Sequence, residues 1–148
     1  MRPRPLLTPL RRIPTLKGDV LHGMKIGDPG YAGIAEAYFS TVHPRTVKGW
    51  KRHHEMTLNL ICIQGAIRFV VHDGGETAQP PFDVTLSPDQ GELYQRLTVP
   101  PGLWVGFEGI GAGSNMLVNL ASRAHDPAEA ENVDLAKFEW PHRCELRA

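Results

Sequence analysis

Disulfide bonds, an excess of charge and long apolar runs are all missing from this sequence of 148 residues. Only two cysteines occur, Cys62 and Cys144. They are too few for a disulfide framework, and Cys62 lies within an apolar run, so a reducing compartment is favoured. The 16 basic and 16 acidic residues balance, which argues against a nucleic-acid-binding surface and against attraction to an anionic membrane.

Targeting and membrane-spanning signals are missing as well. No run approaches the roughly 18 apolar residues that a membrane helix needs. The basic N-terminus, "MRPRPLLTPLRRIPT", has no apolar core of signal-peptide length and no small-residue cleavage site. We therefore expect a soluble, cytoplasmic protein that binds neither nucleic acid nor a membrane.

Helical periodicity is scarce, and the chain is dominated by short β-rich runs between turn signals. It contains 15 glycines and 13 prolines, and runs such as "HDGGE", "SPDQG" and "VPPG" mark turns. Only residues 126–138 have helical character, with Asp126 as a possible N-cap and Pro127 at the first helical position. Strands at this spacing predict an all-β sandwich or barrel.

We expect one domain over residues 1–148, with residues 1–17 as an N-terminal extension. The expected strands are Val20–Ile26, Ile34–Val42, Met56–Ile63, Ala66–His72, Phe82–Leu86, Gln95–Val99, Leu103–Glu108 and Met116–Leu120.

One stretch, "TVKGWKRHHEMTLNL" (46–60), carries cations and imidazoles into an apolar strand. Successive strand residues point to opposite faces of a sheet. Lys51, His53 and Asn59 share one parity, which stays polar, whereas Arg52 and His54 share the parity that becomes apolar. If the register holds, the first group lines a polar cleft; a β-bulge would exchange His53 for His54.

A metal site is one interpretation of this stretch. Metal-binding cupin barrels use two histidines two positions apart and a third on a distant strand, after a turn like "VPPG". Here His53 and His54 are adjacent, so their side chains diverge, and Val105 stands where the distant histidine belongs. A valine cannot bind a metal, so we predict no metal and no cofactor.

Proton transfer is the other interpretation, and the sequence resembles a known family that carries it out. The runs "VKGWKRHHEMTLNLICIQGAIRFVVHD", "LTVPPGLWVGFEGIG", "NMLVNLASRAHDPAE" and "FEWP" resemble the dTDP-4-dehydrorhamnose 3,5-epimerase family over roughly residues 18–141. The resemblance implies a metal-free, cupin-type double-stranded β-helix, or jelly-roll sandwich, with a short C-terminal helix. It also implies a homodimer in which an early strand crosses to the neighbouring subunit.

The family's substrate is a nucleoside-diphosphate-linked 4-keto-6-deoxy sugar. A base removes the proton next to the ketone, and an acid returns a proton to the other face of the sugar. Transferring the family's motif to this chain puts Lys51 at the position of the base, with His53 two residues on. Asn119 stands at the position of the tyrosine that acts as the acid. The aspartate that pairs with the family's histidine, beyond "EWP", has no counterpart. Lysine could act as the base only if its pKa were strongly depressed.

Four further residues are candidates for substrate binding. Lys48 and Arg52 are candidate anchors for the diphosphate. Glu36 matches a glutamate that reaches the sugar pocket in the family, and Asn59 continues the polar face. Two functions stay open, in deoxysugar or surface-polysaccharide biosynthesis. The chain is either an epimerase or isomerase of a nucleotide-linked sugar or a non-catalytic cupin that binds one. Polar groups that persist on a strand face favour the enzyme.

Overall fold

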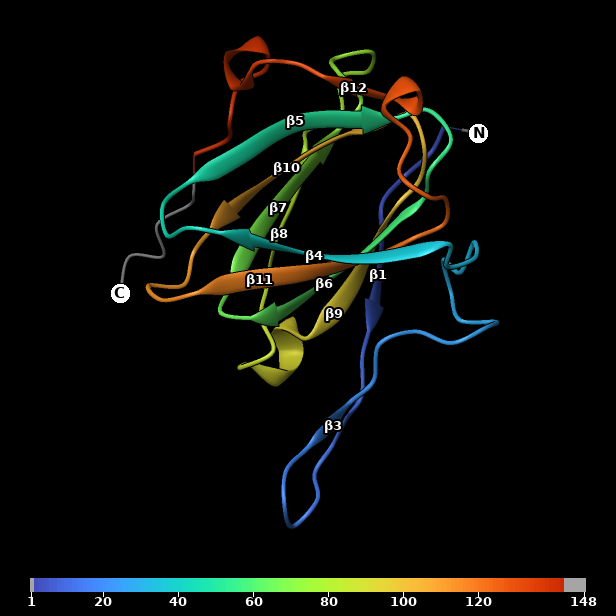
Figure 1. Ribbon diagram of the computed structural model, residues 1–148. Helices are drawn as coiled ribbons and strands as arrows, with labels where there is room; N and C mark the ends of the chain where they lie inside the picture. Colours follow the sequence, from blue (N-terminus) through green and yellow to red (C-terminus); the bar gives the residue numbers. More distant parts are fainter. Residues whose placement is uncertain (1, 143–148) are drawn as a thin grey trace.

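The computed structural model describes residues 2–142, so Cys144 and the rest of the tail lie outside the described part of the chain. Its architecture is two facing antiparallel sheets of five strands each (Figure 1). The first sheet has the order β1 (Leu6–Pro9), β9 (Gln95–Val99), β6 (Leu58–Gln64), β11 (Asn115–Ala121) and β4 (Glu36–Val42). The second has the order β12 (Ala130–Asn132), β5 (Val47–His53), β10 (Trp104–Gly109), β7 (Ile67–His72) and β8 (Phe82–Leu86).

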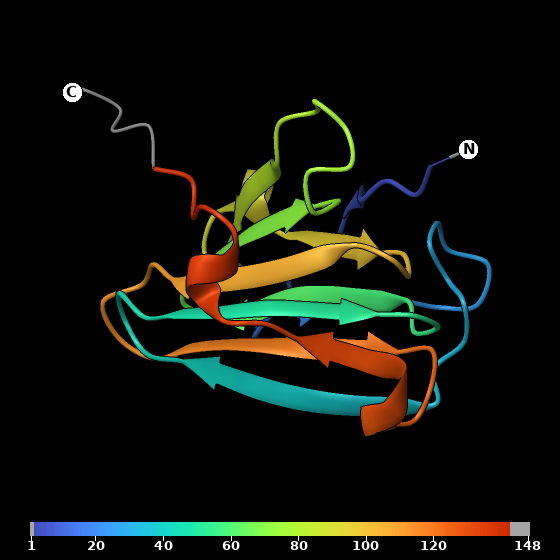
Figure 2. The ribbon, with the colours of Figure 1, turned by 90° about the horizontal axis from the view of Figure 1, so that it is seen from above.

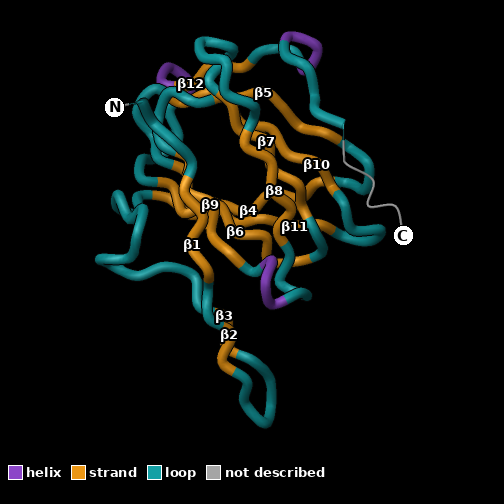
Figure 3. Tube along the Cα trace, turned by 180° about the vertical axis from the view of Figure 1, so that it is seen from behind, coloured by secondary structure: helices purple, strands orange, loops and turns teal. Residues whose placement is uncertain are grey.

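The remaining elements are short. β2 (Arg12–Ile13) and β3 (Val20–Leu21) form a hairpin that projects from the sandwich (Figure 3). Three 3-10 turns complete the chain, namely η1 (Gly91–Leu93), η2 (Pro127–Glu129) and η3 (Leu135–Lys137). This nearly all-β arrangement confirms the predicted fold class.

The main core fills the space between the two sheets because alternate residues of the facing strands are apolar. Leu58, Leu60 and Cys62 point inward from β6 and meet Phe69 and Val71 from β7. A second apolar cluster, around Trp50, Val70 and Trp104, covers the outer face of the second sheet. The segment 133–140 completes that cluster and crosses over β5 and β10 (Figure 2).

Two predicted elements differ from the structure. The helix expected over residues 126–138 is replaced by η2, β12 and η3. The side chains of Asp126 and Asp134 each cap a single turn, and between these turns β12 pairs with β5. The strand expected from Val20 to Ile26 is only Val20–Leu21, because the chain then turns to cover the outer face of the first sheet.

A β-bulge in β5 decides which side chains reach the interior. Val105 of β10 pairs with Lys51 of β5, and Phe107 of β10 pairs with Lys48. Gly106 alone therefore lies opposite two residues of β5, Gly49 and Trp50. The extra residue reverses the alternation once. As a result, Lys48 and Lys51, three positions apart, both line the interior, while Trp50 packs into the outer apolar cluster.

Candidate active site

A cavity of about 260 Å³ opens between the two sheets, with walls from β4 and β11 on one side and from β5 and β10 on the other. Its apolar lining comes from leucines of β6 and β11 and from Val105 and Phe107 of β10. The polar side chains that line it are Tyr38, Ser40, Lys48, Lys51, His53, Asn119 and Asn132. A largely apolar cavity with a few convergent polar groups is the usual form of a small-molecule site.

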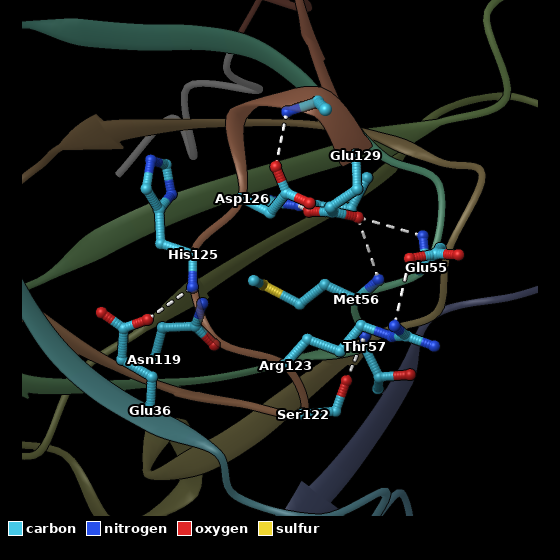
Figure 4. A network of polar contacts seen from close by, with 12 residues as sticks. Glu36, Glu55, Met56, Thr57, Asn119, Ser122, Arg123, His125, Asp126 and Glu129 are labelled. Carbon is cyan, nitrogen blue, oxygen red and sulfur yellow. Dashed lines mark hydrogen bonds and ion pairs between the residues drawn. The ribbon is translucent and has the colours of Figure 1, made fainter.

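His53 lies in the wall formed by β5 and is only 5 % exposed. Its Nδ1 hydrogen-bonds to Oε1 of Glu129, which is 6 % exposed. The other carboxylate oxygen accepts backbone N–H bonds from Glu55 at 3.1 Å and Met56 at 3.2 Å (Figure 4). Glu129 therefore has a partner at both oxygens, and it fixes the ring of His53 as well as the turn that follows β5.

The electrostatics of this pair favour a neutral imidazole next to an ionised carboxylate. Burial lowers the pKa of His53, although the bond to Glu129 opposes this effect. Burial alone would raise the pKa of Glu129, but the bonds from His53, Glu55 and Met56 leave that pKa below its usual value. A neutral His53 that donates Nδ1–H to the carboxylate has an unprotonated Nε2. This arrangement is that of a general base held by an orienting carboxylate.

Tyr38 and Asn119 are paired in the opposite sheet, where they face each other directly across β4 and β11. Nδ2 of Asn119 donates to the Tyr38 hydroxyl at 3.0 Å, and Oδ1 of Asn119 accepts from the Asn59 backbone N–H at 3.2 Å. Burial raises the pKa of Tyr38; the Asn119 bond opposes this, and the charges of Glu36 and Glu129 add to it. The phenol is therefore protonated at neutral pH, and Asn119 holds it in place.

Lys51, His53 and Asn119 are brought together in this cavity, together with Lys48. The Lys48 ammonium donates to the Thr41 carbonyl at 2.6 Å and lies 6.0 Å from the centre of the Phe107 ring. The structure thus brings these four candidates into the lining of one cavity.

The other three candidates are not brought into the cavity. Arg52 lies on the outer face, where its Nε donates to Glu131 at 2.9 Å and its guanidinium stacks on Trp104. The carboxylate of Glu36 accepts the His125 backbone N–H and lies outside the cavity lining (Figure 4).

Asn59 points to the opposite face of its sheet, where it bonds to Thr98 and to the Gly30 carbonyl. The reason is that β5 ends at His53 and the chain enters the other sheet at Leu58. The alternation that the sequence analysis extended through this turn therefore does not continue.

Tyr38 and Glu129 are the site residues that sequence reasoning missed. Tyr38 shares the strand parity of Glu36, but its place opposite Asn119 depends on the pairing of β4 with β11, which no local pattern encodes. Glu129 lies in the segment assigned to a helix. The carboxylate that bonds to His53 thus comes from η2 and not from the chain beyond "EWP".

A metal-binding cluster does not form within residues 2–142, where no group of three or more histidine, cysteine or acidic side chains comes together. His54 is 46 % exposed and lies 3.6 Å from Glu131, while His53 lines the interior and Val105 lines the same cavity. The two imidazoles therefore diverge, as their adjacent positions predict.

No helix in this described part of the chain is long and apolar enough to cross a membrane. The cytoplasmic location stays a prediction.

The fold and the site together define a cupin-type barrel with a histidine–carboxylate pair on one wall and a phenol on the other. The family described as "FdtA: WxcM-like, C-terminal" matches residues 33–139, and the chain belongs to this family. This match does not confirm the narrower assignment to the dTDP-4-dehydrorhamnose 3,5-epimerase family.

Solved structures of sugar-nucleotide enzymes share the fold. A dTDP sugar isomerase from Desulfovibrio desulfuricans G20 is 34 % identical with a TM-score of 0.82, over 93 % of this chain and 89 % of that one. The sugar 3,4-ketoisomerase QdtA from Thermoanaerobacterium thermosaccharolyticum, in complex with TDP, is 22 % identical with a TM-score of 0.69, over 86 % of each chain. The 3'-monoepimerase ChmJ from Streptomyces bikiniensis, in complex with dTDP-quinovose, is 16 % identical with a TM-score of 0.73, over 91 % of this chain and 74 % of that one. At these lower identities, the last two show the fold alone.

A curated relative is similar over a shorter stretch. The probable low-salt glycan biosynthesis epimerase Agl13 of Haloferax volcanii is 29 % identical in an alignment of 100 residues that covers 61 % of this chain. The aligned part spans 58 % of the length of that relative.

Proposed function

We propose that the protein is an isomerase or epimerase of a nucleotide-linked 4-keto-6-deoxy sugar and acts by removing the proton next to the ketone. The observation that carries the proposal is the neutral His53, oriented by Glu129, on the wall of a cavity whose opposite wall holds a protonated Tyr38. The similarity to a dTDP sugar isomerase along most of both chains supports the same reaction class.

In the first step His53 acts as the base. The C–H bond next to the ketone breaks, its proton goes to Nε2, and its electron pair forms an enolate with the negative charge on oxygen. Glu129 stabilises the imidazolium that results. The ammonium of Lys51, in the same wall, stabilises the enolate oxygen.

The second step decides between epimerisation and isomerisation. A proton delivered by Tyr38 from the opposite wall would reach the other face of the sugar and invert the carbon. A proton returned by His53 would arrive on the original face, at the same carbon or at the neighbouring one. Asn119 has no proton to give at neutral pH, so we assign it as a positioning residue for Tyr38.

The substrate's diphosphate requires cations near the cavity, and Lys48 supplies one from its lining. Bound TDP in QdtA and dTDP-quinovose in ChmJ support thymidine diphosphate as the nucleotide portion. We do not assign Arg52 to this role, because it lies on the outer face, bonded to Glu131 and stacked on Trp104.

Replacing Lys48 therefore tests the diphosphate contact. We expect Lys48→Ala to weaken binding of dTDP by about 10- to 150-fold, since a charge-assisted hydrogen bond contributes roughly 1.5–3 kcal/mol. Arg52→Ala is the matched control and should leave the affinity unchanged. Isothermal titration calorimetry of both variants measures the difference; equal losses in the two would place the diphosphate elsewhere.

We also propose a homodimer. Phe39, on the edge strand β4, is 63 % exposed, and Leu16 and Val20 are exposed on the projecting hairpin. An unpaired strand edge with exposed apolar side chains favours association with a second copy. Sedimentation at micromolar concentration tests this, and a monomer would contradict it.

Solvent deuterium tests the proposed reaction directly. The protein should exchange the carbon-bound proton next to the ketone of a dTDP-linked 4-keto-6-deoxy sugar in D2O, even where net turnover is slow. Mass spectrometry of the recovered sugar nucleotide reports the exchange. A protein that binds dTDP but exchanges no proton on any keto sugar would support the non-catalytic function instead.

The pH dependence of this exchange should reveal the base. Since burial holds the pKa of His53 below its ordinary value of 6.5, the exchange rate should decline only at pH values below 6.5. In Glu129→Gln the rate should fall, and its acid limb should move to still lower pH because the carboxylate that favours the imidazolium is gone. Exchange rates between pH 4.5 and 8 measure both effects. An acid limb above pH 6.5 in the wild type would point to another base.

A further inference from the structure

A second pocket, which we call the arm pocket, lies on the outer face of the first sheet, where residues of β1 and β9 meet residues from the base of the β2–β3 hairpin. Figure 3 shows the course of this hairpin relative to β1 and β9. The arm pocket is separate from the candidate active site, because its sheet residues Thr8 and Arg96 belong to the face opposite the main core. Arg96 pairs across the sheet with Ile61, a member of the apolar cluster on that outer face. The polar side chains that line the arm pocket are Thr8, Arg11, His22, Lys25, Asp28 and Arg96.

Arg96 is the unusual member of this group because it is fully buried, at 0 % exposure. Its two Nη atoms donate to the carbonyls of Gly23 and Pro29, each at 2.7 Å, and the nearest carboxylate oxygen, of Asp28, lies 3.9 Å away. Neutral carbonyls and one distant carboxylate compensate only part of the desolvation of a buried guanidinium. Burial accordingly lowers the pKa of Arg96.

Two residues that line the arm pocket each have a buried polar atom without a partner among the described residues, namely Nε of Arg96 and Oγ1 of Thr8. The two residues face each other directly across β1 and β9, so these atoms lie on the same face of the sheet. Buried polar atoms of native proteins are almost always paired. A guanidinium N–H beside a hydroxyl is a suitable donor pair for a single oxyanion.

The charge and the size of the arm pocket restrict the ligand. Arg11, Lys25 and Arg96 are three cations against the single carboxylate of Asp28, an excess of two positive charges. The cavity is about 280 Å³, several times the roughly 30 Å³ that one water occupies. A hydrated dianion fits both this charge and this volume.

We propose that the arm pocket binds a small phosphate-class dianion, held by Nε of Arg96 and Oγ1 of Thr8 and neutralised by Arg11 and Lys25. The ligand would join residues of β1, β9 and the hairpin base, and so would fix the projecting hairpin to the sheet. The proposal concerns a face of the molecule that the proposed reaction does not use.

Inorganic phosphate is the probe for this site. The full chain, purified without phosphate, is heated in phosphate and in chloride at matched ionic strength. A ligand at ten times its Kd should raise Tm by about 3–6 °C for a protein of this size. The rise should saturate with phosphate concentration. Equal Tm values in the two salts up to 20 mM phosphate overturn the proposal.

Variants locate the effect. Thr8→Val removes the hydroxyl while keeping the shape, and Arg11→Gln with Lys25→Gln removes the two exposed cations without disturbing buried Arg96. Each should weaken phosphate binding about tenfold or more, whereas Lys17→Gln, on the hairpin but outside the pocket, should bind as the wild type does. Phosphate binding unchanged in the first two variants overturns the proposal.

A further variant separates this site from the proposed active site. Lys48→Ala, in the main cavity, should keep the phosphate-dependent rise in Tm even where dTDP binding is weakened. Loss of the rise in Lys48→Ala alone would assign the phosphate to the main cavity and overturn the arm pocket. The keto-sugar exchange assay decides the proposed reaction independently of either result.

Discussion

His53→Gln should lower deuterium exchange into a 4-keto sugar nucleotide by about 10²–10⁴-fold, the range that a positioned general base contributes. The amide fills a similar volume but cannot accept the proton, so dTDP affinity should stay within a few-fold of the wild type. Mass-spectrometric exchange rates and calorimetric dTDP binding, measured on the same preparation, check the two halves of this prediction.

The neighbouring residues supply the controls. His54→Gln changes an identical side chain one position along, on the solvent side of the sheet, and should leave exchange unchanged. Lys51→Arg distinguishes the alternative base. If Lys51 stabilises the enolate, the guanidinium should retain much of the rate; if Lys51 removes the proton, arginine abolishes exchange because it stays protonated. If His53→Gln exchanges deuterium at the wild-type rate and Lys51→Arg does not, then Lys51 is the base and His53 is not.

Tyr38→Phe should have the second large effect, and it should affect the two halves of the reaction differently. Proton abstraction by His53 continues, so deuterium exchange should stay within about tenfold of the wild type. Inversion of the carbon should fall by about 10²-fold or more, because the opposite face loses its acid. Nuclear magnetic resonance of the sugar product separates exchange with retention from exchange with inversion.

Asn119→Asp and Tyr31→Phe complete this test. The aspartate reverses the polarity of the contact with the Tyr38 hydroxyl and raises the pKa of that phenol further, so inversion should fall while exchange continues. Tyr31 lies outside the cavity lining, and its loss should change neither measurement. A Tyr38→Phe enzyme that inverts at the wild-type rate would remove Tyr38 from the mechanism. A wild-type product in which the ketone has moved to the neighbouring carbon would make the protein a ketoisomerase.

The fold followed from the sequence because its signals are local and repeated. Runs of β-branched and apolar residues between glycine and proline turns identify β6, β7, β9 and β10 within one or two residues of their observed bounds. The prediction of a helix in the C-terminal segment was wrong for a reason that is not local. Ala130–Asn132 gains backbone partners from β5, and this pairing outweighs the helical pattern around it.

The site was predictable only in part. Lys51 and His53 could be found because both lie on the same side of the bulge, where the alternation along β5 is regular. Asn59 could not be placed correctly, since the parity was carried across a turn into a different sheet. Lys48 reaches the cavity through a bulge, which no sequence rule dictates.

Tyr38 and Glu129 illustrate the other limit. Each gains its role from a partner that is distant in the chain, Asn119 for the tyrosine and His53 for the glutamate. Such contacts depend on which strands become neighbours, and an amino-acid pattern read along the chain contains no direct record of that choice.

The second carboxylate oxygen of Glu129, which accepts the backbone N–H groups of Glu55 and Met56, makes the state of the base visible without any substrate. The amide chemical shifts of these two residues respond to the charge and position of that oxygen. Magnetic resonance spectra of the free protein, recorded over a range of pH, would therefore follow the histidine–carboxylate pair through two backbone reporters.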